Sequence, residues 1–135
     1  MISVEKLNDL CKNTLMETLD IEYLEVSEGR ISARMPVNSK TFQPMKRLHG
    51  GAIMALAESV ASAGSLAMVD ASKVQVLGTE ISGSHVNGAT DGFVTAEATI
   101  LNAGRTSHLW EIRIVSDSGK LISVCRMTNR LMPVK

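Results

Sequence analysis

The segment at residues 45–68, MKRLHGGAIMALAESVASAGSLAM, constrains the fold more than any other part of this 135-residue chain. Its apolar and small side chains are typical of a helix buried in a protein core, and the glycine pair after His49 predicts a helix start near His49 to Gly51. Six alanines between residues 52 and 67, together with Gly64, would let a concave sheet close on the helix. We therefore expect one long central helix covered on most sides by strands.

Glu58 is the one carboxylate in the middle of this helix. Its neighbours one turn away are Met54, Ala55, Ala61 and Ser62, and no Lys or Arg of the helix lies within four positions. Because burying an unpaired carboxylate is costly, Glu58 is either turned to solvent, paired with an arginine from a strand, or kept for chemistry. The lack of a polar stripe around it disfavours a solvated position, so we expect a buried carboxylate.

The N-terminal part predicts a helix followed by a hairpin. Residues 3–19 carry apolar side chains at helical spacing, which indicates one short amphipathic helix packed on the rest. From Ile21 the pattern changes to alternation, and residues 27–29 supply a turn between two antiparallel strands. The second strand is expected to bury Ile31, Ala33, Met35 and Val37. A polar loop then leads to the long helix.

Four further strand candidates, separated by turn-forming residues, follow the long helix. They span residues 74–86, 92–102, 107–116 and 121–131. This order predicts an α+β fold in which one antiparallel sheet, with the last four strands in a meander, wraps around the central helix. The length fits one domain, residues 1–135.

Charge and cysteine content disfavour several classes of function. The chain has 14 basic and 14 acidic residues without a run of one sign, so we expect neither nucleic-acid nor membrane binding. No apolar run approaches the ~18 residues of a membrane span, and the N-terminus does not fit a signal peptide, so a cytoplasmic protein is expected. Cys11 and Cys125 lack metal-ligand spacing, so we expect buried free thiols and no metal or cofactor.

The start of the central helix is a second candidate for chemistry. Gly50 and Gly51 lie where backbone N–H groups are unpaired at the positive end of the helix dipole, which favours negative charge developing on a ligand. Gly50 precedes Glu58 by eight residues, or roughly 12 Å along the helix, which is far for two groups acting on one carbon. The two groups could still meet across a two-fold axis, one from each subunit of a dimer.

The motifs LHGGAIMALAES, FQP, GTEISGSHV and GRTSHLW resemble those of the hotdog-fold acyl-CoA thioesterases. The resemblance covers nearly the whole chain and is greatest to the PaaI-like branch with the bacterial 1,4-dihydroxy-2-naphthoyl-CoA hydrolases and the Arthrobacter-type 4-hydroxybenzoyl-CoA thioesterases. It implies a hotdog fold and a cytoplasmic enzyme that hydrolyses an aromatic or bulky acyl-CoA without a cofactor. It also implies a homodimer that assembles into a homotetramer and, for the naphthoyl substrate, a place in menaquinone biosynthesis.

The resemblance assigns catalytic roles to individual residues. It implies that the Gly50 N–H polarises the thioester carbonyl and that Glu58 of the other subunit acts as nucleophile or general base. Ser62 falls on the hydroxyl that holds the attacking water, and Gln43 on the glutamine of the preceding loop. His49 falls beside the thioester, where helix capping is the alternative role.

The contacts with coenzyme A that the resemblance implies come from two other segments. They are Gly78, His85, Val86, Asn87 and Gly88, and then Asn102, Ala103, Gly104, Arg105, Thr106 and Ser107. Relatives usually have Asn and Arg where this chain has Ser84 and Asn87. The missing arginine puts one phosphate contact in doubt, which Arg105 could supply unless it is a solvated loop residue.

Two other functions compete with thioester hydrolysis: a noncatalytic module that binds acyl-CoA as a sensor, and a hotdog hydratase. The sensor is disfavoured because Glu58 and Ser62 are both present and no DNA-binding segment is added. The hydratase is disfavoured because His49 has no Asp at a suitable spacing in its helix. No Gly-x-Ser-x-Gly elbow or Cys–His pair supports a hydrolase triad. The sequence therefore predicts a thioesterase.

Overall fold

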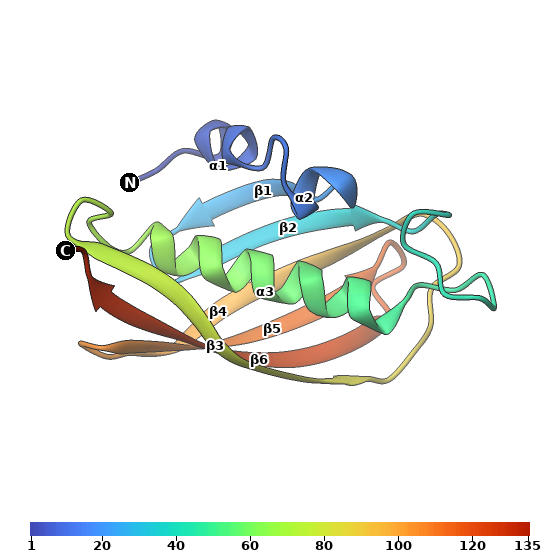
Figure 1. Cartoon of the computed structure of the whole chain (residues 1–135). Helices are drawn as coiled ribbons and strands as arrows, with labels where there is room; N and C mark the ends of the chain where they lie inside the picture. Colours follow the sequence, from blue (N-terminus) through green and yellow to red (C-terminus); the bar gives the residue numbers. More distant parts are fainter.

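A six-stranded antiparallel sheet curves around one long helix in the computed structural model, which describes residues 1–135 (Figure 1). The elements in chain order are α1 (Val4–Leu10), α2 (Leu15–Thr18), β1 (Glu22–Ser27), β2 (Arg30–Pro36), α3 (Gly50–Leu66), β3 (Val74–His85), β4 (Phe93–Ala103), β5 (Ser107–Ser116) and β6 (Leu121–Pro133). Helix α3 lies on the concave face of the sheet, and α1 and α2 lie near β1 and β2 (Figure 1). The predicted α+β hotdog fold is confirmed.

The strand order across the sheet is β1-β2-β4-β5-β6-β3. Strands β4, β5 and β6 form a meander as predicted, but the expectation that β3 begins this meander is wrong, because β3 pairs with β6 and β2 pairs with β4. The segment between β3 and β4 does not close a hairpin. Its Ala89 and Gly92 carbonyls accept hydrogen bonds from Leu48 and Val37, which ties it to the loop before α3. Strand β3 therefore forms an edge of the sheet.

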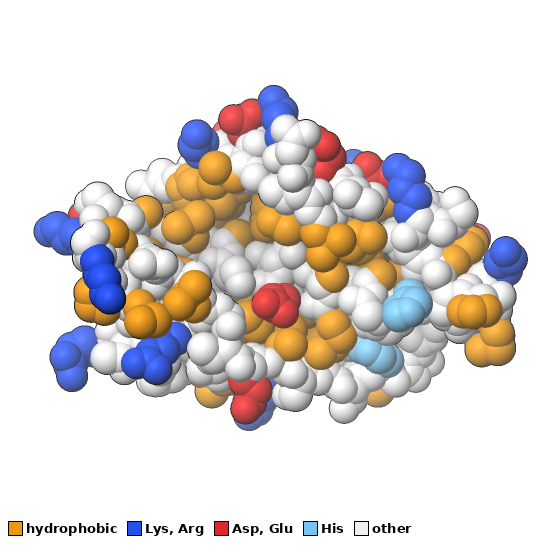
Figure 2. All heavy atoms as spheres, viewed as in Figure 1, with side chains coloured by type: hydrophobic (Ala, Val, Ile, Leu, Met, Phe, Trp, Pro, Cys, Tyr) orange, Lys and Arg blue, Asp and Glu red, His pale blue; other side chains and the backbone are white.

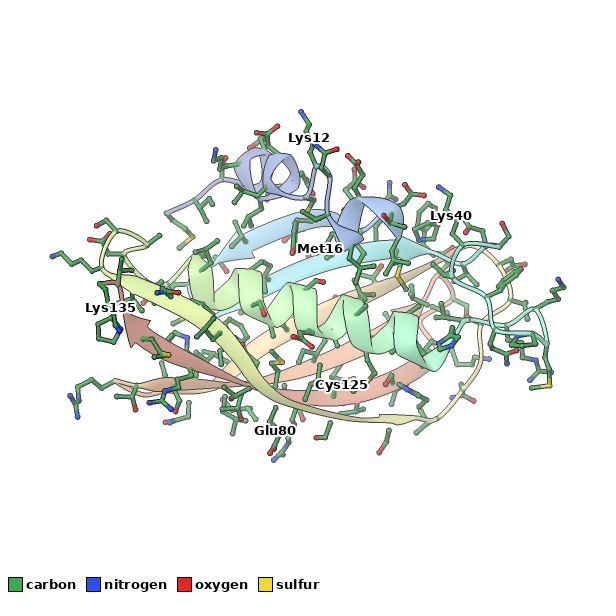
Figure 3. The ribbon with its side chains drawn as sticks, viewed as in Figure 1. Lys12, Met16, Lys40, Glu80, Cys125 and Lys135 are labelled. Carbon is green, nitrogen blue, oxygen red and sulfur yellow. The ribbon has the colours of Figure 1, made fainter.

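The helix predicted over residues 3–19 is interrupted. Helix α1 ends at Leu10 and α2 begins at Leu15, because Asn13 has a φ of 62°, a left-handed conformation that a helix cannot continue through. Met16 of α2 lies toward α3, whereas Lys12 and Lys40 point away from it (Figure 3). Helix α1 packs against β1, whereas α2 places Met16 beside α3.

The β1–β2 hairpin matches the alternation in the sequence. Gly29 has a φ of 77° in the turn, where residues with a Cβ are strained, and Ser27 pairs with Arg30 on either side of it. The predicted apolar face is buried, with exposed fractions of 0 to 5% for Ile31, Ala33, Met35 and Val37. The hairpin prediction is confirmed.

The small residues of α3 allow the sheet to approach closely. A Cβ on Gly64 would lie 2.6 Å from Cη2 of Trp110 and 3.0 Å from Cγ2 of Ile31, so a larger residue would not fit. Cys11 and Cys125 are buried free thiols, as predicted. None of the helices has the length and apolar character needed to cross a membrane.

Candidate active site

The start of α3 leaves one backbone N–H free. His49 is the N-cap, and its Nδ1 accepts a hydrogen bond of 2.7 Å from the Gly51 N–H. The His49 carbonyl accepts from Ala52 and Ile53, so the first-turn N–H without a partner in the chain is that of Gly50. The predicted helix start is confirmed, and so is a capping role for His49. The Gly50 N–H points outward from the positive end of the helix dipole.

His85, at the end of β3, packs against Gly50. A Cβ on Gly50 would lie 3.1 Å from both Cδ2 and Nε2 of the His85 ring, so only glycine leaves the ring undisturbed. The Ser123 hydroxyl donates to the Ser84 carbonyl at 3.1 Å, so its oxygen accepts from Nδ1 of His85 at 2.9 Å. In the tautomer that this hydrogen bond selects, Nδ1 carries the proton and Nε2 is the acceptor nitrogen, which lies beside the helix start.

Gln43 lies in the loop that leads to α3. Its side-chain Oε1 accepts a hydrogen bond from the Met45 N–H, and its own N–H donates to the Arg47 carbonyl at 2.7 Å. The isolated bridge between Phe42 and Leu48 closes this loop just before the helix. Gln43 is therefore held near the same end of α3 as His49 and Gly50.

A mostly apolar groove of about 840 Å³ runs between α3, the N-terminal helices and the first half of β3. Its apolar walls include Leu7, Leu10, Leu15, Met16, Tyr23, Met54, Leu66, Val74 and Val76. On this face, hydrophobic side chains gather on both sides of a hollow that contains one acidic side chain (Figure 2). A groove of this size and character suits a bulky apolar ligand group.

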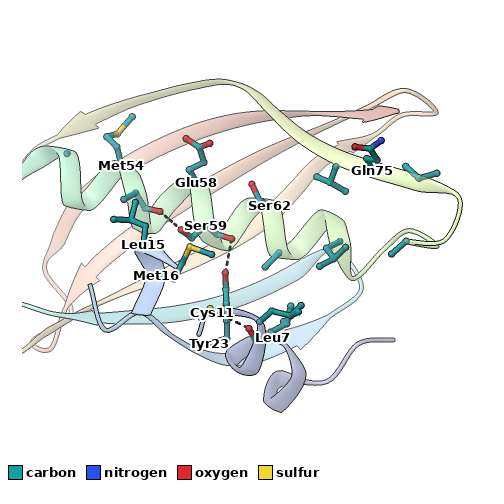
Figure 4. Close-up of a pocket in the computed structure, with 18 residues that line it drawn as sticks. Leu7, Cys11, Leu15, Met16, Tyr23, Met54, Glu58, Ser59, Ser62 and Gln75 are labelled. Atoms are coloured by element: carbon teal, nitrogen blue, oxygen red, sulfur yellow. Dashed lines mark hydrogen bonds between the residues drawn. The ribbon is translucent and has the colours of Figure 1, made fainter. Parts of the chain in front are cut away.

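Glu58 and Ser62 lie in this groove, one turn apart on α3, and both point toward β3 (Figure 4). Glu58 Oε2 lies 3.1 Å from the position that a Cβ on Gly78 would occupy, so the glycine makes room for the carboxylate. The prediction that Glu58 is buried is wrong for the single chain, where it is exposed. The physical reason is that β3 is an edge strand and the chain leaves this side of α3 uncovered.

The predicted coenzyme A contacts lie at opposite ends of the sheet. His85 pairs with Ser123 near the start of β6, and Ser107 pairs with Arg130 near its end. Residues 85–88 are therefore beside the start of α3, whereas residues 102–107 form the distant β4–β5 turn, and Glu58 and Gly78 lie between them. One chain does not bring the predicted site residues together.

Within the two predicted segments, some polar groups already form hydrogen bonds within the chain. The Asn87 side-chain amide donates to the Leu121 carbonyl at 2.8 Å, and the Gly104 N–H donates to the Ser107 carbonyl at 2.9 Å. Val86 is exposed, as are the side chains of Arg105 and Thr106. Of these residues, Arg105 offers a cation for a phosphate group.

Arg47 and the groove walls were not predicted from the sequence. A Cβ on Gly88 would lie 3.8 Å from Cδ of Arg47, so this arginine lies against the segment that follows His85. The basic residues just before the HGG motif were a signal that could have identified it. No such signal pointed to Leu15, Met16 and Tyr23, because they lie far in the sequence from the α3 residues with which they line the groove.

A family model described as "Thioesterase superfamily" matches residues 45–123, from the loop before α3 into β6. The chain belongs to the thioesterase superfamily. It is therefore an enzyme of the thioester hydrolase class, as the sequence predicted.

Individual thioesterases resemble this chain along most of its length. It is 39% identical to the Pseudomonas aeruginosa esterase PA1618 over 97% of this chain and 90% of that protein. The solved structure of a PA1618 mutant, described as a thioesterase, matches with a TM-score of 0.97 at 37% identity over 99% of this chain and 96% of that one. The Escherichia coli 1,4-dihydroxy-2-naphthoyl-CoA hydrolase is 33% identical over 97% of this chain and 96% of that protein.

Two solved structures of the Staphylococcus aureus thioesterase SAV0944 also match, each with a TM-score of 0.87 and 39% identity. They cover 89% and 88% of this chain and 99% and 98% of the SAV0944 chains. One carries alanine in place of a glutamate and the other carries alanine in place of a glutamine. Together these similarities confirm the superfamily and the hotdog fold, and the branch within the superfamily stays a prediction.

Proposed function

We propose that this thioesterase hydrolyses an aromatic or otherwise bulky acyl-CoA to the free acid and coenzyme A, with Glu58 as nucleophile or general base. The observation that carries the proposal is the position of Glu58, a carboxylate without a partner in the chain, in the middle of the apolar groove. A pocket that is apolar apart from a few convergent polar groups is the usual form of a small-molecule site. The groove would hold the acyl group.

Polarisation of the thioester carbonyl falls to the Gly50 N–H. It has no partner in the chain and lies at the positive end of α3, so it can stabilise the negative charge that develops on the carbonyl oxygen. One well-placed donor of this kind contributes about 3 to 4 kcal/mol to lowering the barrier. His49 fixes the geometry by capping the same turn.

Glu58 can act in two ways that both require an ionised carboxylate. It can attack the carbonyl carbon, which expels the thiolate and leaves a mixed anhydride, or it can remove a proton from a water held by the Ser62 hydroxyl. Ser62 shares the groove with Glu58 one turn further along α3, and its hydroxyl forms no hydrogen bond within the chain. Both routes release coenzyme A.

The site would be completed by a second copy of the chain. Gly50 and Glu58 lie about two turns apart on one helix, and β3 is an edge strand that ends beside Gly50. Antiparallel pairing of two β3 strands about a two-fold axis would carry the Gly50 end of one chain toward Glu58 of the other. A homodimer is therefore the proposed unit, and two dimers would form the homotetramer.

The Staphylococcus aureus structures support the choice of Gln43 and Glu58. The glutamine and the glutamate that were replaced in SAV0944 are separated by the same number of residues as Gln43 and Glu58. We assign Gln43 to the thioester end of the site, because the loop before α3 holds it close to Gly50.

Coenzyme A would extend from the thioester along residues 85–88 and the 102–107 turn of the dimer. Arg105 in the turn and Arg47 beside Gly88 are the cations available for its phosphates, since the Asn87 amide is bonded to Leu121. A cytoplasmic enzyme acting on 1,4-dihydroxy-2-naphthoyl-CoA in menaquinone biosynthesis is the specific case to test first, given the similarity to the Escherichia coli hydrolase.

The experiment is a thiol-release assay with a panel of aryl and aliphatic acyl-CoAs, including 1,4-dihydroxy-2-naphthoyl-CoA, on the wild type and on Glu58→Gln. We expect turnover to be greatest with the aryl substrates and kcat of Glu58→Gln to fall at least about a hundredfold. Its thermal midpoint should change little, because Glu58 is exposed and unpaired in the chain.

The matched control is Glu97→Gln, which changes an exposed carboxylate on β4 away from the groove and should leave kcat unchanged. Turnover near the wild-type value in Glu58→Gln would contradict the proposed role. Tight binding of acyl-CoA by the wild type without any thiol release would favour the noncatalytic module instead.

A further inference from the structure

A group of four polar side chains lies buried between α3 and the inner face of the sheet, next to the groove. Ser65 of α3 is its centre. The Ser65 Oγ lies 2.8 Å from Nδ1 of His108, 2.8 Å from Nε1 of Trp110 and 2.9 Å from Nδ2 of Asn129. All four residues are at least 96% buried. We call them the Ser65 network.

The donors and acceptors of the Ser65 network follow from its chemistry. Trp110 Nε1 can only donate, and Asn129 Nδ2 donates both to Ser65 and to the Ala61 carbonyl at 3.1 Å, which can only accept. Ser65 therefore accepts two hydrogen bonds and donates its own proton to Nδ1 of His108. The orientation of the Asn129 amide is fixed, with its Oδ1 turned away from Ser65.

Asn129 Oδ1 is the one buried side-chain nitrogen or oxygen that has no hydrogen-bond partner. Asn129 pairs with Gly78 across β6 and β3, and Oδ1 lies 3.8 Å from the position that a Gly78 Cβ would occupy. Glu58 Oε2 lies 3.1 Å from the same position. Both oxygen atoms therefore face the inner side of Gly78. Asn129 Oδ1 can only accept a hydrogen bond, and so can Glu58 Oε2 when Glu58 is ionised, so both can bind a donor placed there.

We infer that Asn129 is a positioning residue that, together with Glu58, holds the hydrolytic water over Gly78. This inference rests on the proposed function of Glu58 and selects its general-base form. A water has two O–H donors, so one can bind Glu58 and the other Asn129 Oδ1. The water oxygen can then accept a hydrogen bond from the Ser62 hydroxyl and keep its other lone pair for the thioester carbon, while both O–H groups of the water are held in place.

The step balances without any further reagent. The water oxygen forms a bond to the carbonyl carbon while its proton passes to Glu58, and the carbon–sulfur bond then breaks. The thiolate of coenzyme A leaves and takes up the proton from Glu58. Asn129 exchanges no proton and only orients the water, which is why an uncharged amide suffices at this position.

Met127 lies over the space on the inner side of Gly78 that the water would enter. Its Cε methyl contacts the inner side of Gly78, where it covers the space that a Cβ would otherwise fill. A methionine side chain has three rotatable bonds and moves at little cost, so its methyl can move aside when water or acyl-CoA enters. The missing side chain at Gly78 is what makes this space large enough.

The test compares Asn129→Leu with Ser65→Ala. Asn129→Leu keeps the volume and removes Oδ1, so kcat should fall at least about tenfold while KM stays within about twofold. Ser65→Ala breaks the centre of the Ser65 network but leaves Oδ1 and the bond from Nδ2 to Ala61 in place, so its kcat should stay within about threefold of the wild type. Both variants should lower the thermal midpoint, which separates stability from rate.

A crystal structure of the wild type with a non-hydrolysable acyl-CoA thioether supplies a second measurement in case Asn129→Leu does not fold. We expect a water within hydrogen-bond distance of both Glu58 Oε2 and Asn129 Oδ1. Wild-type kcat in a folded Asn129→Leu, equal loss of kcat in both variants, or no water between the two oxygens would overturn the inference. If one of these results is found and Glu58→Gln is inactive, the role of Asn129 is excluded but the proposed function of Glu58 still stands. An active Glu58→Gln would exclude both the proposed function and the inference.

Discussion

Helix α3 carries two groups of polar side chains that differ in how the fold treats them. Glu58 and Ser62 face the groove and form no side-chain hydrogen bond or ion pair within the chain. Ser65, one turn further, is fully buried and forms three hydrogen bonds. A polar residue in an apolar helix is therefore not in itself a functional signal. What separates the two groups is whether the chain supplies their partners.

Glu58 and Ser62, which we call the groove group, would act together with the backbone donor Gly50 at the start of α3. Removal of this donor should give the largest effect. Gly50→Pro deletes the free N–H at the first helical position, where proline is well tolerated, and should lower kcat by about a hundredfold to a thousandfold. Gly50→Ala places a similar Cβ against His85 but keeps the N–H, so it is the matched control. Thiol-release rates decide the case. Equal losses in both variants would assign the effect to crowding of His85.

A substitution in the Ser65 network should instead lower the free energy of unfolding. Ser65→Ala leaves Trp110 Nε1 and His108 Nδ1 without partners in the core, at about 1 to 3 kcal/mol for each unsatisfied group. Ser62→Ala is the control from the groove group, and its unfolding free energy should stay close to that of the wild type. Chemical denaturation measures both. A similar loss for the two variants would break the distinction between the groups.

A smaller effect is expected from the titration of His108. Burial lowers the pKa of His108 below its ordinary value of 6.5, so the unfolded chain takes up a proton at a higher pH than the folded chain. The contribution of His108 to stability is therefore fully present above about pH 6.5 and decreases as the pH falls through that value.

His108→Gln is the variant that tests this pH dependence. Its side-chain oxygen can still accept the Ser65 proton but does not titrate in this range. Urea denaturation at pH 7.5 and 5.5 should show a smaller loss of stability in His108→Gln than in the wild type. An identical loss in the two proteins would show that His108 is not the group responsible.

The smallest effect is expected at the coenzyme A end. Arg105 is exposed in the β4–β5 turn, and exposed ion pairs are weak. Arg105→Ala should raise KM for acyl-CoA severalfold and leave hydrolysis of a pantetheine thioester unchanged, because that substrate lacks the nucleotide. Arg47→Ala is the parallel variant beside Gly88. Equal losses of Arg105→Ala on both substrates would indicate a structural role.

Local patterns in the sequence predicted most of the elements. The alternation in residues 107–116 matches β5 residue for residue, and the HGG motif marked the start of α3. The break at Asn13 was missed because a single left-handed residue leaves the apolar spacing intact. The pairing of β3 with β6 was missed because it is set by how the sheet closes around α3 and not by local turn chemistry.

The candidate site divides in the same way. Glu58 and Gly50 could be chosen as candidates from the pattern of one helix, and Ser62 was added by the family resemblance. The exposure of Glu58 was predicted wrongly, because it depends on an edge strand far away in sequence. Asn129 gave no signal, since its inferred role depends on α3, β3 and β6 meeting at one point. Chemistry carried by a motif could be predicted, whereas chemistry assembled by packing could not.

The central claim is that one active site combines Gly50 of one chain with Glu58 of another, and subunit complementation tests it most directly. Glu58→Gln and Gly50→Pro are each expected to be nearly inactive alone. In a mixed dimer, one site would receive both intact groups and the other neither. Random exchange should therefore restore about one quarter of the wild-type rate, since half of the dimers are mixed and each has one working site. With exchange verified by differently tagged chains, a mixture that stays inactive would contradict a site shared between two subunits.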